Sequence, residues 1–84
     1  MYTLYILKCS DGSLYTGITN DLESRLAKHA AGKGSKYVRS RLPFELFYTE
    51  QFPDRSTAQK REYEVKQMKR EEKLRINNEK LGND

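Results

Sequence analysis

The sequence predicts an α+β fold, in which a small three-stranded antiparallel sheet is flanked by helices in the order β-β-α-β-α-α. Three observations favour this fold class. Two β-rich segments near the N-terminus are separated only by a short turn sequence, which is typical of a hairpin. Two later segments combine cap residues with the apolar spacing of helices. A chain of 84 residues has room for one core, so we expect a single domain over 1–77 and a disordered tail over 78–84.

The first predicted element is a hairpin formed by Tyr2–Cys9 and Leu14–Thr19. Both segments are rich in β-branched and aromatic residues, and Asp11-Gly12 lies between them. A two-residue turn at Asp-Gly would put Tyr5 and Tyr15 on opposite faces of the sheet, whereas a loop with an odd residue count would put them on one face. The strand residues alone leave both registers open.

A helix should follow the hairpin directly. Asn20 is a favoured N-cap, and Glu23 stands where a side chain can return to the cap amide. The apolar stripe of this helix comprises Leu22, Leu26 and Ala30. Arg25 and His29 are four residues apart, so their side chains are expected to project together at the margin of that stripe.

The third predicted strand is Phe44–Phe52, which is rich in aromatic residues and ends at Pro53. Its alternation places Glu45 and Phe47 on one face of the sheet. The residues on the other face are Phe44, Leu46 and Tyr48. A glycine-punctuated basic loop over 31–36 and one helical turn over Tyr37–Ser40 are expected before this strand.

The chain should end with two helices. The first begins at Ser56, with Gln59 in the capping-box position, and runs to about residue 69. At about 100° per residue, Glu62 lies within its inward apolar stripe. A buried, unpaired carboxylate is costly, so Glu62 should be matched by an arginine, hydrogen bonds or a metal ion. A final short helix is predicted over Arg70–Ile76.

Positive charge is concentrated in the middle of the chain. The net charge is +4, and the segment from Arg25 to Arg41 contains no acidic residue. Its basic residues are Arg25, Lys28, Lys33, Lys36, Arg39 and Arg41. Nucleic-acid phosphates are the partner that we expect for such a segment, and a solvated basic surface is the alternative.

Cysteine content and hydropathy exclude several other classes of protein. The single cysteine, Cys9, excludes an internal disulfide and a cysteine-rich zinc site. The apolar start, Tyr2–Leu7, is too short to span a membrane and lacks the basic flank of a signal peptide. We therefore expect a cytoplasmic protein without membrane association.

Four short motifs, in this order, resemble the GIY-YIG nuclease superfamily, and in particular its short stand-alone bacterial members. Thr3-Leu4-Tyr5 stands where the family has GIY, and Tyr15-Thr16-Gly17 stands where it has YIG. The third motif is Asp21-Leu22-x-x-Arg25-Leu26-x-x-His29. Ala58-x-x-Arg61-Glu62 is similar to the family helix that carries a metal-binding glutamate. The resemblance covers nearly the whole chain.

The resemblance implies hydrolysis of phosphodiester bonds with one divalent metal ion, Mg²⁺ or Mn²⁺, bound by Glu62. Tyr5 and Tyr15 would line the site, and one of them would assist deprotonation of the attacking water. Arg25 would hold the scissile phosphate, and His29 would fill a position often occupied by histidine or tyrosine. An unperturbed phenol has a pKa of about 10, so a tyrosine base would need nearby cations to act near neutrality.

By the same resemblance, Gly17 would allow the backbone to approach closely. The clustered positive charge adds further nucleic-acid-binding candidates, which are Lys28, Lys33, Lys36, Arg39 and Arg41. Two tyrosines in one site require the odd hairpin loop, so we predict that register.

The expected function is thus a metal-dependent endonuclease. No base-reading element is evident, so selectivity for the structure of the substrate is expected, with DNA favoured over RNA. The protein should be a monomer or a weak dimer. A catalytically weak or inactive nucleic-acid-binding domain is the first alternative. A protein-interaction domain that uses the helix face from Val65 to Leu74 is the second.

Overall fold

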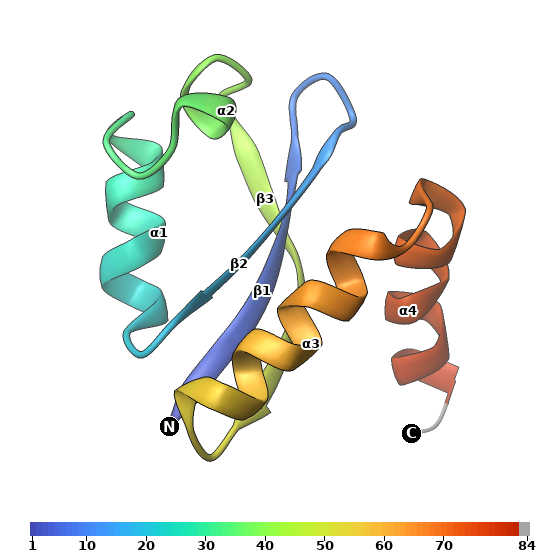
Figure 1. The fold of residues 1–84 in the computed structure, drawn as a ribbon. Helices are drawn as coiled ribbons and strands as arrows, with labels where there is room; N and C mark the ends of the chain where they lie inside the picture. Colours follow the sequence, from blue (N-terminus) through green and yellow to red (C-terminus); the bar gives the residue numbers. More distant parts are fainter. Residues whose placement is uncertain (83–84) are drawn as a thin grey trace.

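The computed structural model describes residues 1–82, with side chains through Ile76. It confirms the α+β fold, the predicted three strands and the helical turn expected before the third strand (Figure 1). The elements are β1 (Tyr2–Cys9), β2 (Leu14–Thr19), α1 (Leu22–Ala30), α2 (Lys36–Arg39), β3 (Phe44–Phe52), α3 (Arg55–Gln67) and α4 (Arg70–Gly82).

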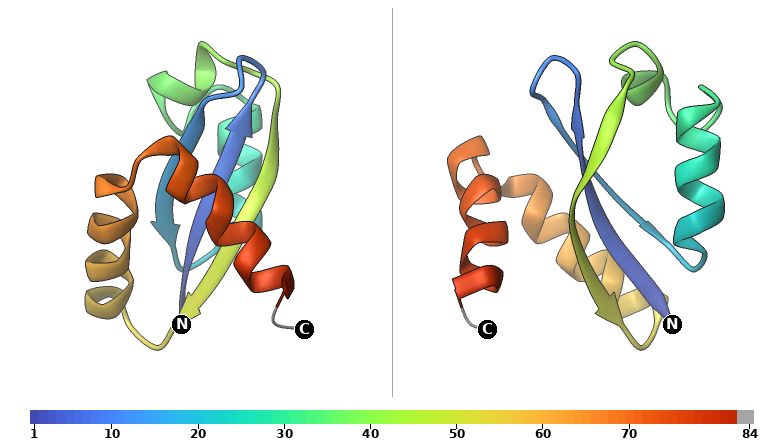
Figure 2. Two further views of the ribbon diagram at one scale, coloured as in Figure 1. Left: turned by 90° about the vertical axis from the view of Figure 1, so that its right-hand side faces the viewer. Right: turned by 180° about the vertical axis from the view of Figure 1, so that it is seen from behind.

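The sheet lies between two helical layers. Its strand order is β2-β1-β3 with both pairs antiparallel, so β1 is central and β2 is an edge strand. Helices α1 and α2 cover one face, and α3 and α4 cover the other (Figures 1 and 2). The core beneath α3 and α4 is formed by Leu4, Ile6, Tyr48, Val65 and Ile76. The core beneath α1 and α2 is formed by Tyr5, Leu7 and Val38.

The hairpin has the odd loop that the family resemblance predicts. The Cys9 amide donates to the Ser13 carbonyl at 2.8 Å, which leaves residues 10–12 in the loop. The register of the β1–β2 pair consequently puts Tyr5 and Tyr15 on the same face, beneath α1 and α2. This prediction is confirmed.

The third strand departs from its predicted alternation. Its pairing with β1 shifts by one residue, so that Ile6 lies opposite Tyr48 but Leu7 lies opposite Leu46. Phe47 is the extra residue of this bulge and packs with the core beneath α3 and α4. Leu46 is 44% exposed at the sheet edge. The predicted alternation is wrong because a bulge reverses the facing of side chains in mid-strand.

Two helix caps also differ from the sequence prediction. Asp21 caps α1 in place of Asn20, and Asp54 caps α3 in place of Ser56. Each carboxylate accepts a hydrogen bond from the amide three residues later. A carboxylate is favoured over a neutral cap because it also interacts with the positive end of the helix dipole.

The remaining boundaries shift by small amounts, with one exception. Helix α3 ends at Gln67, two residues earlier than predicted, and α2 begins one residue earlier than the predicted turn. Helix α4 continues past Ile76 to Gly82, through most of the segment for which the sequence predicts a disordered tail. Residues 83–84 lie outside the described part. None of the helices within residues 1–82 has the length and apolar character needed to cross a membrane.

Candidate functional site

The candidate site is built around Tyr5, a buried tyrosine in the middle of the central strand. Tyr5 is 1% exposed, and its hydroxyl oxygen lies 2.9 Å from Nε2 of His29, which is equally buried. The strand register puts Gly17 directly opposite Tyr5. A Cβ atom at Gly17 would lie 2.6 Å from the Tyr5 hydroxyl oxygen. Only glycine therefore leaves the phenol room to pass over β2 and reach α1.

The imidazole of His29 is enclosed on several sides. The rings of Tyr15 and Phe44 face it with centroid distances of 5.4 Å and 6.2 Å. Its Nδ1 has no hydrogen-bond partner among the described residues, and a Cβ at Gly34 would approach that atom to 2.6 Å. Burial lowers the pKa of His29, and the charge of Arg25 lowers it further. The imidazole is consequently neutral at neutral pH.

The phenol of Tyr5 is protonated in the resting site. Burial raises the pKa of Tyr5, and the nearby Tyr15 and Glu62 raise it further, while Arg25 acts in the opposite direction. Of the two neighbours Arg25 and His29, Arg25 supplies positive charge near Tyr5, whereas the neutral His29 does not. Tyr5 instead faces a neutral ring nitrogen that can accept its proton.

Glu62 approaches the same region from the opposite helical layer. It lies on α3 with its side chain 22% exposed, and the Nζ atom of Lys66 is 3.2 Å from its Oε2. Because β2 is an edge strand and α3 packs against it, the carboxylate can act on Tyr5 around the sheet edge. The arginine partner that the sequence suggests is absent among the described residues, since Arg61 lies 3.2 Å from Glu50 instead.

The donors around Glu62 suit a cation that is bound jointly with substrate. Within residues 1–76, no three His, Cys, Asp or Glu side chains are grouped so that they could hold a metal ion. A single carboxylate is compatible with Mg²⁺, which keeps several waters and often takes substrate phosphate oxygens as further ligands. Glu62 fits that chemistry, and a cation bound there would compete with Lys66 for the carboxylate.

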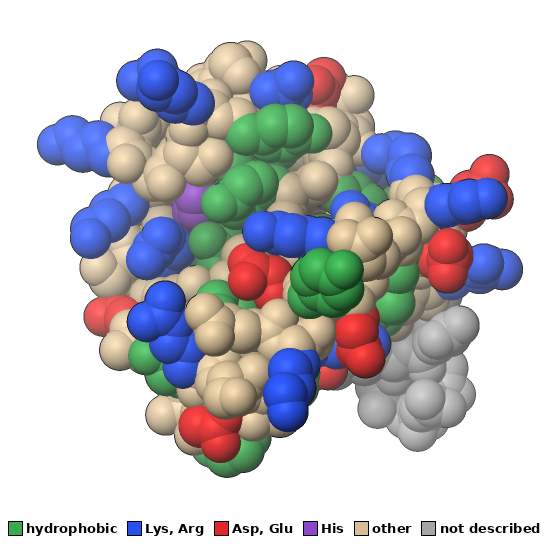
Figure 3. All heavy atoms as spheres, in the orientation of Figure 1, with side chains coloured by type: hydrophobic (Ala, Val, Ile, Leu, Met, Phe, Trp, Pro, Cys, Tyr) green, Lys and Arg blue, Asp and Glu red, His purple; other side chains and the backbone are tan. Residues whose placement is uncertain are grey.

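Four of the predicted nucleic-acid-binding residues form an exposed basic surface on α1, α2 and the loop between them. They are Lys28, Lys33, Lys36 and Arg39. None of them forms a salt bridge with an acidic residue in the described part of the chain. Figure 3 shows Lys and Arg side chains gathered over this side of the molecule. The surface is therefore available to a polyanion.

Arg41 and Gly17, the other two predicted residues, also make contacts within the fold. The Nε atom of Arg41 lies 3.0 Å from a carboxylate oxygen of Asp11, and its guanidinium lies 3.9 Å from the centroid of the Tyr37 ring. Arg41 thus joins the hairpin loop to α2. Gly17 is buried, and the group that approaches it closely is the Tyr5 side chain.

Two residues of the site carry no clear signal in the sequence. Gly34, which packs against His29, lies in a loop whose glycines suggest only flexibility. Tyr37 stacks on Tyr15 with a centroid distance of 6.0 Å, although the short helix that carries it has no motif of its own. The fold brings both to the site through long-range packing.

Comparisons with known proteins match nearly the whole chain. A sequence profile of the GIY-YIG catalytic domain matches residues 1–75. The UPF0213 protein of Oceanobacillus iheyensis is 53% identical over 73 residues, which cover 87% of this chain and 85% of that protein. The UPF0213 protein of Halobacterium salinarum is 48% identical over 73 residues, which cover 87% and 95% of the two chains.

Two solved structures are similar in both fold and sequence. The solution NMR structure of a UPF0213 protein from Bacillus halodurans has a TM-score of 0.59 and 49% identity, over 90% of this chain and 82% of that one. A protein from E. faecalis has a TM-score of 0.64 and 39% identity, over 89% and 80%. The UPF0213 relatives are uncharacterised, so these similarities concern the fold and the family rather than a reaction.

Proposed function

The chain belongs to the family of GIY-YIG catalytic domains, and on that premise we propose that it is an endonuclease that hydrolyses phosphodiester bonds with one divalent metal ion. The observation that carries the proposal is the buried hydrogen bond between Tyr5 and His29. The charge of Arg25 acts on both Tyr5 and His29, and the charge of Glu62 acts on Tyr5. The two helical motifs therefore place charged residues near the tyrosine of the first strand motif.

Tyr5 and His29 are suited to remove a proton from water as a unit. The Tyr5 hydroxyl can accept a proton from the attacking water while it donates its own proton to Nε2 of His29. This transfer needs no free phenolate, which burial of Tyr5 disfavours. The ring starts neutral because burial lowers the pKa of His29. The transfer uses the tautomer with its proton on Nδ1, which leaves Nε2 to accept from the Tyr5 hydroxyl. The histidine thus provides the basicity that an isolated phenol lacks at neutral pH.

Arg25 is suited to hold the phosphate that is cleaved. Its side chain is half-buried and has no salt bridge with a described acidic residue. A planar guanidinium can donate two parallel hydrogen bonds to phosphate oxygens. Its position near both Tyr5 and His29 would keep the phosphorus atom close to the water that this pair activates.

Glu62 is the residue that would hold the metal ion. A divalent cation bound there supplies Lewis-acid stabilisation of the negative charge that develops on the phosphate oxygens. In the structure Lys66 neutralises the Glu62 carboxylate, and a bound cation would take the place of that contact. The exposed cations Lys28, Lys33, Lys36 and Arg39 would contact phosphates along the strand. Such contacts carry no base information, so we expect selectivity for DNA structure rather than for sequence.

Cleavage of labelled single-stranded, duplex, flapped and branched DNA and RNA tests the proposal. We expect cleavage with Mg²⁺ or Mn²⁺, none with EDTA and none with Glu62→Gln, which keeps the side-chain shape but removes its charge. Glu64→Gln is the matched control, because Glu64 lies on the same helix with its side chain 63% exposed. Both variants should keep the nucleic-acid affinity of the wild type.

Salt-sensitive binding without cleavage of any substrate would contradict the enzymatic proposal. It would favour instead a binding domain on a nuclease scaffold.

A further inference from the structure

We propose that a second phosphate-binding site lies next to the candidate active site, in a pocket that contains Arg25 and Arg55, and that it holds a neighbouring phosphate of the same strand. The pocket has a volume of about 210 Å³ and is lined by Tyr2, Ile18, Thr19, Asn20, Arg25 and Arg55. The inference rests on the proposed function, because it places the scissile phosphate at Arg25. It adds a positioning site that the four family motifs do not contain.

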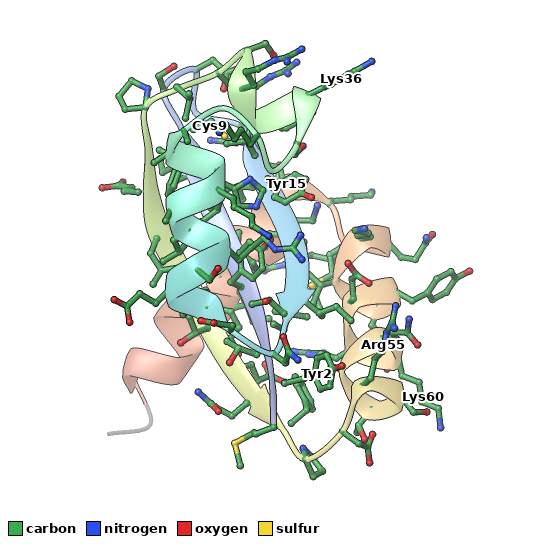
Figure 4. The ribbon with its side chains drawn as sticks, turned by 90° about the vertical axis from the view of Figure 1, so that its left-hand side faces the viewer. Tyr2, Cys9, Tyr15, Lys36, Arg55 and Lys60 are labelled. Atoms are coloured by element: carbon green, nitrogen blue, oxygen red, sulfur yellow. The ribbon has the colours of Figure 1, made fainter. Side chains whose placement is uncertain are left out.

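The pocket forms where four separate segments of the chain meet. Tyr2 begins β1, Asn20 follows β2, Arg25 lies in α1, and Arg55 is the first residue of α3. Figure 4 shows Tyr2 and Arg55 close to each other beside the first turn of α3, with Lys60 on the outer side of the same helix. Because the segments come from both helical layers, the pocket lies at the β2 edge of the sheet.

The charges of the pocket favour an anion. Two guanidinium groups line it, and no carboxylate does. Neither Arg25 nor Arg55 forms a salt bridge with an acidic residue within residues 1–76. Two like charges in one small pocket repel each other unless an anion is bound between them. A phosphate in the pocket would relieve this repulsion, and it matches the fork of donors on Arg55.

The two carboxylates directly adjacent in sequence to lining residues, Asp21 and Asp54, form no salt bridge with either arginine. Asp21 follows Asn20, but its carboxylate accepts a hydrogen bond from the Ser24 amide at the start of α1. Asp54 precedes Arg55, but its carboxylate accepts one from the Thr57 amide at the start of α3. Both are used as helix caps, and neither lines the pocket.

The uncharged lining residues can also donate to a phosphate. The Asn20 amide group and the Tyr2 hydroxyl each carry a hydrogen-bond donor. The Thr19 hydroxyl is used already, since it contacts the backbone of Asp21. The pocket therefore offers two charged and two neutral donors, without a competing acid.

Arg25 connects this pocket with the candidate active site. Its charge lowers the pKa of both Tyr5 and His29, so it lies near the Tyr5–His29 pair as well as in the pocket. A strand whose scissile phosphate contacts Arg25 would therefore bring an adjacent phosphate within reach of Arg55. Two anchored phosphates fix the direction of the strand across the site, which one alone cannot do.

Binding measurements without cleavage test this site. Fluorescence anisotropy in EDTA would compare the wild type, Arg55→Ala and the control Lys60→Ala on a labelled single-stranded DNA. Lys60 carries the same charge on the same helix, is exposed and does not line the pocket. We expect Arg55→Ala to weaken binding about 5- to 10-fold at low salt and to reduce the salt slope by about one. Lys60→Ala should have a much smaller effect, and Arg55→Lys should restore part of the affinity.

The contacted phosphate is identified with DNA strands that carry one uncharged methylphosphonate linkage. One such linkage should weaken binding by the wild type but not by Arg55→Ala. If removal of a 5′-terminal phosphate gives this pattern instead, the pocket holds a strand end, and the phosphate site is still supported. Equal losses for Arg55→Ala and Lys60→Ala, or the absence of any such phosphate, would overturn the inference.

The same data separate this inference from the proposed function. Wild-type protein that cleaves DNA but shows no specific dependence on Arg55 would refute the pocket alone. Protein that binds with the Arg55 pattern but never cleaves would refute the nuclease and keep the pocket. Protein that binds no nucleic acid at all would refute both.

Discussion

Gly17→Ala is the substitution that most directly tests the geometry of the site. The new Cβ would lie 2.6 Å from the hydroxyl oxygen of Tyr5 and 2.7 Å from its Cζ, whereas ordinary contact begins at 3.4 Å. Tyr5 is 1% exposed, so its ring has little space into which it can move. Either the two strands separate or the phenol turns away from His29.

The expected loss of stability combines three effects. Overpacking of a filled core costs about 1–3 kcal/mol. Loss of the Tyr5–His29 hydrogen bond leaves buried polar groups without a partner, at a cost of about 1–3 kcal/mol. Alanine restricts the unfolded chain more than glycine does, which offsets the loss of stability by about 0.4–1 kcal/mol. The first two effects overlap, since a displaced ring relieves the clash, so the free energy of unfolding should fall by about 2–3 kcal/mol.

Urea unfolding followed by circular dichroism measures this change, and the chain contains no tryptophan for a fluorescence assay. At about 4–8 °C per kcal/mol, the melting temperature should fall by about 10–20 °C. The control is the same substitution in a Tyr5→Leu background, where the phenol is absent. There the alanine should be nearly neutral, so the double-mutant cycle should show a coupling close to the whole effect, about 2–3 kcal/mol. An equal effect of Gly17→Ala in both backgrounds would refute the proposed role of this glycine.

Three further predictions concern the histidine, a helix cap and the metal. Because the folded protein lowers the pKa of His29 below 6.5, the unfolded chain binds the proton more tightly, so stability is complete above pH 6.5 and is lost as the pH falls below it. Urea unfolding above and below pH 6.5 should show that the wild type loses free energy of unfolding at the lower pH, whereas His29→Asn does not show this loss. Asp21→Ala should lower the free energy of unfolding by about 1 kcal/mol, with little change for Asn20→Ala; the reverse order would contradict the assigned cap. Lys66→Ala should lower the Mn²⁺ concentration needed for half-maximal cleavage, because it removes a competing charge from Glu62; an unchanged metal titration would count against Glu62 as the metal ligand.

The strands could be predicted from the sequence because their signals are local. Clusters of β-branched and aromatic residues define β1 and β2, and their bounds agree with the structure. The Asp11-Gly12 pair marks the turn but does not determine its length. In the structure Gly12 takes a left-handed φ of 84°, and Asp11 accepts a hydrogen bond from the Ser13 amide at 3.0 Å, in a three-residue loop. The correct register came from requiring both tyrosines in one site, not from the turn residues.

Features that depend on packing could not be predicted in the same way. The bulge at Phe47 lets this side chain pack into the core beneath α3 and α4, and no residue type in β3 predicts it. The two caps were each misplaced where polar residues lie close together, since several of them can serve as an N-cap. The lysine beside Glu62 is likewise not among the partners that the sequence predicts, which are an arginine, hydrogen bonds or a metal ion. An arginine one residue away on the helix points elsewhere, and the lysine one turn later makes the contact.

The candidate site depends on two features of β2. It is an edge strand, and it has no side chain at Gly17, where the Tyr5 phenol passes. Tyr5 and His29 approach from the face beneath α1, while Glu62 comes from α3 on the opposite face. A central strand would separate these groups, whereas an edge strand lets them meet around its side. Gly17 is the position where the Tyr5 hydroxyl passes over that edge strand. The Tyr5 hydroxyl is therefore held in place by Gly17, His29 and the edge position of β2 together. A change in any one of them should move this hydroxyl away from Nε2 of His29.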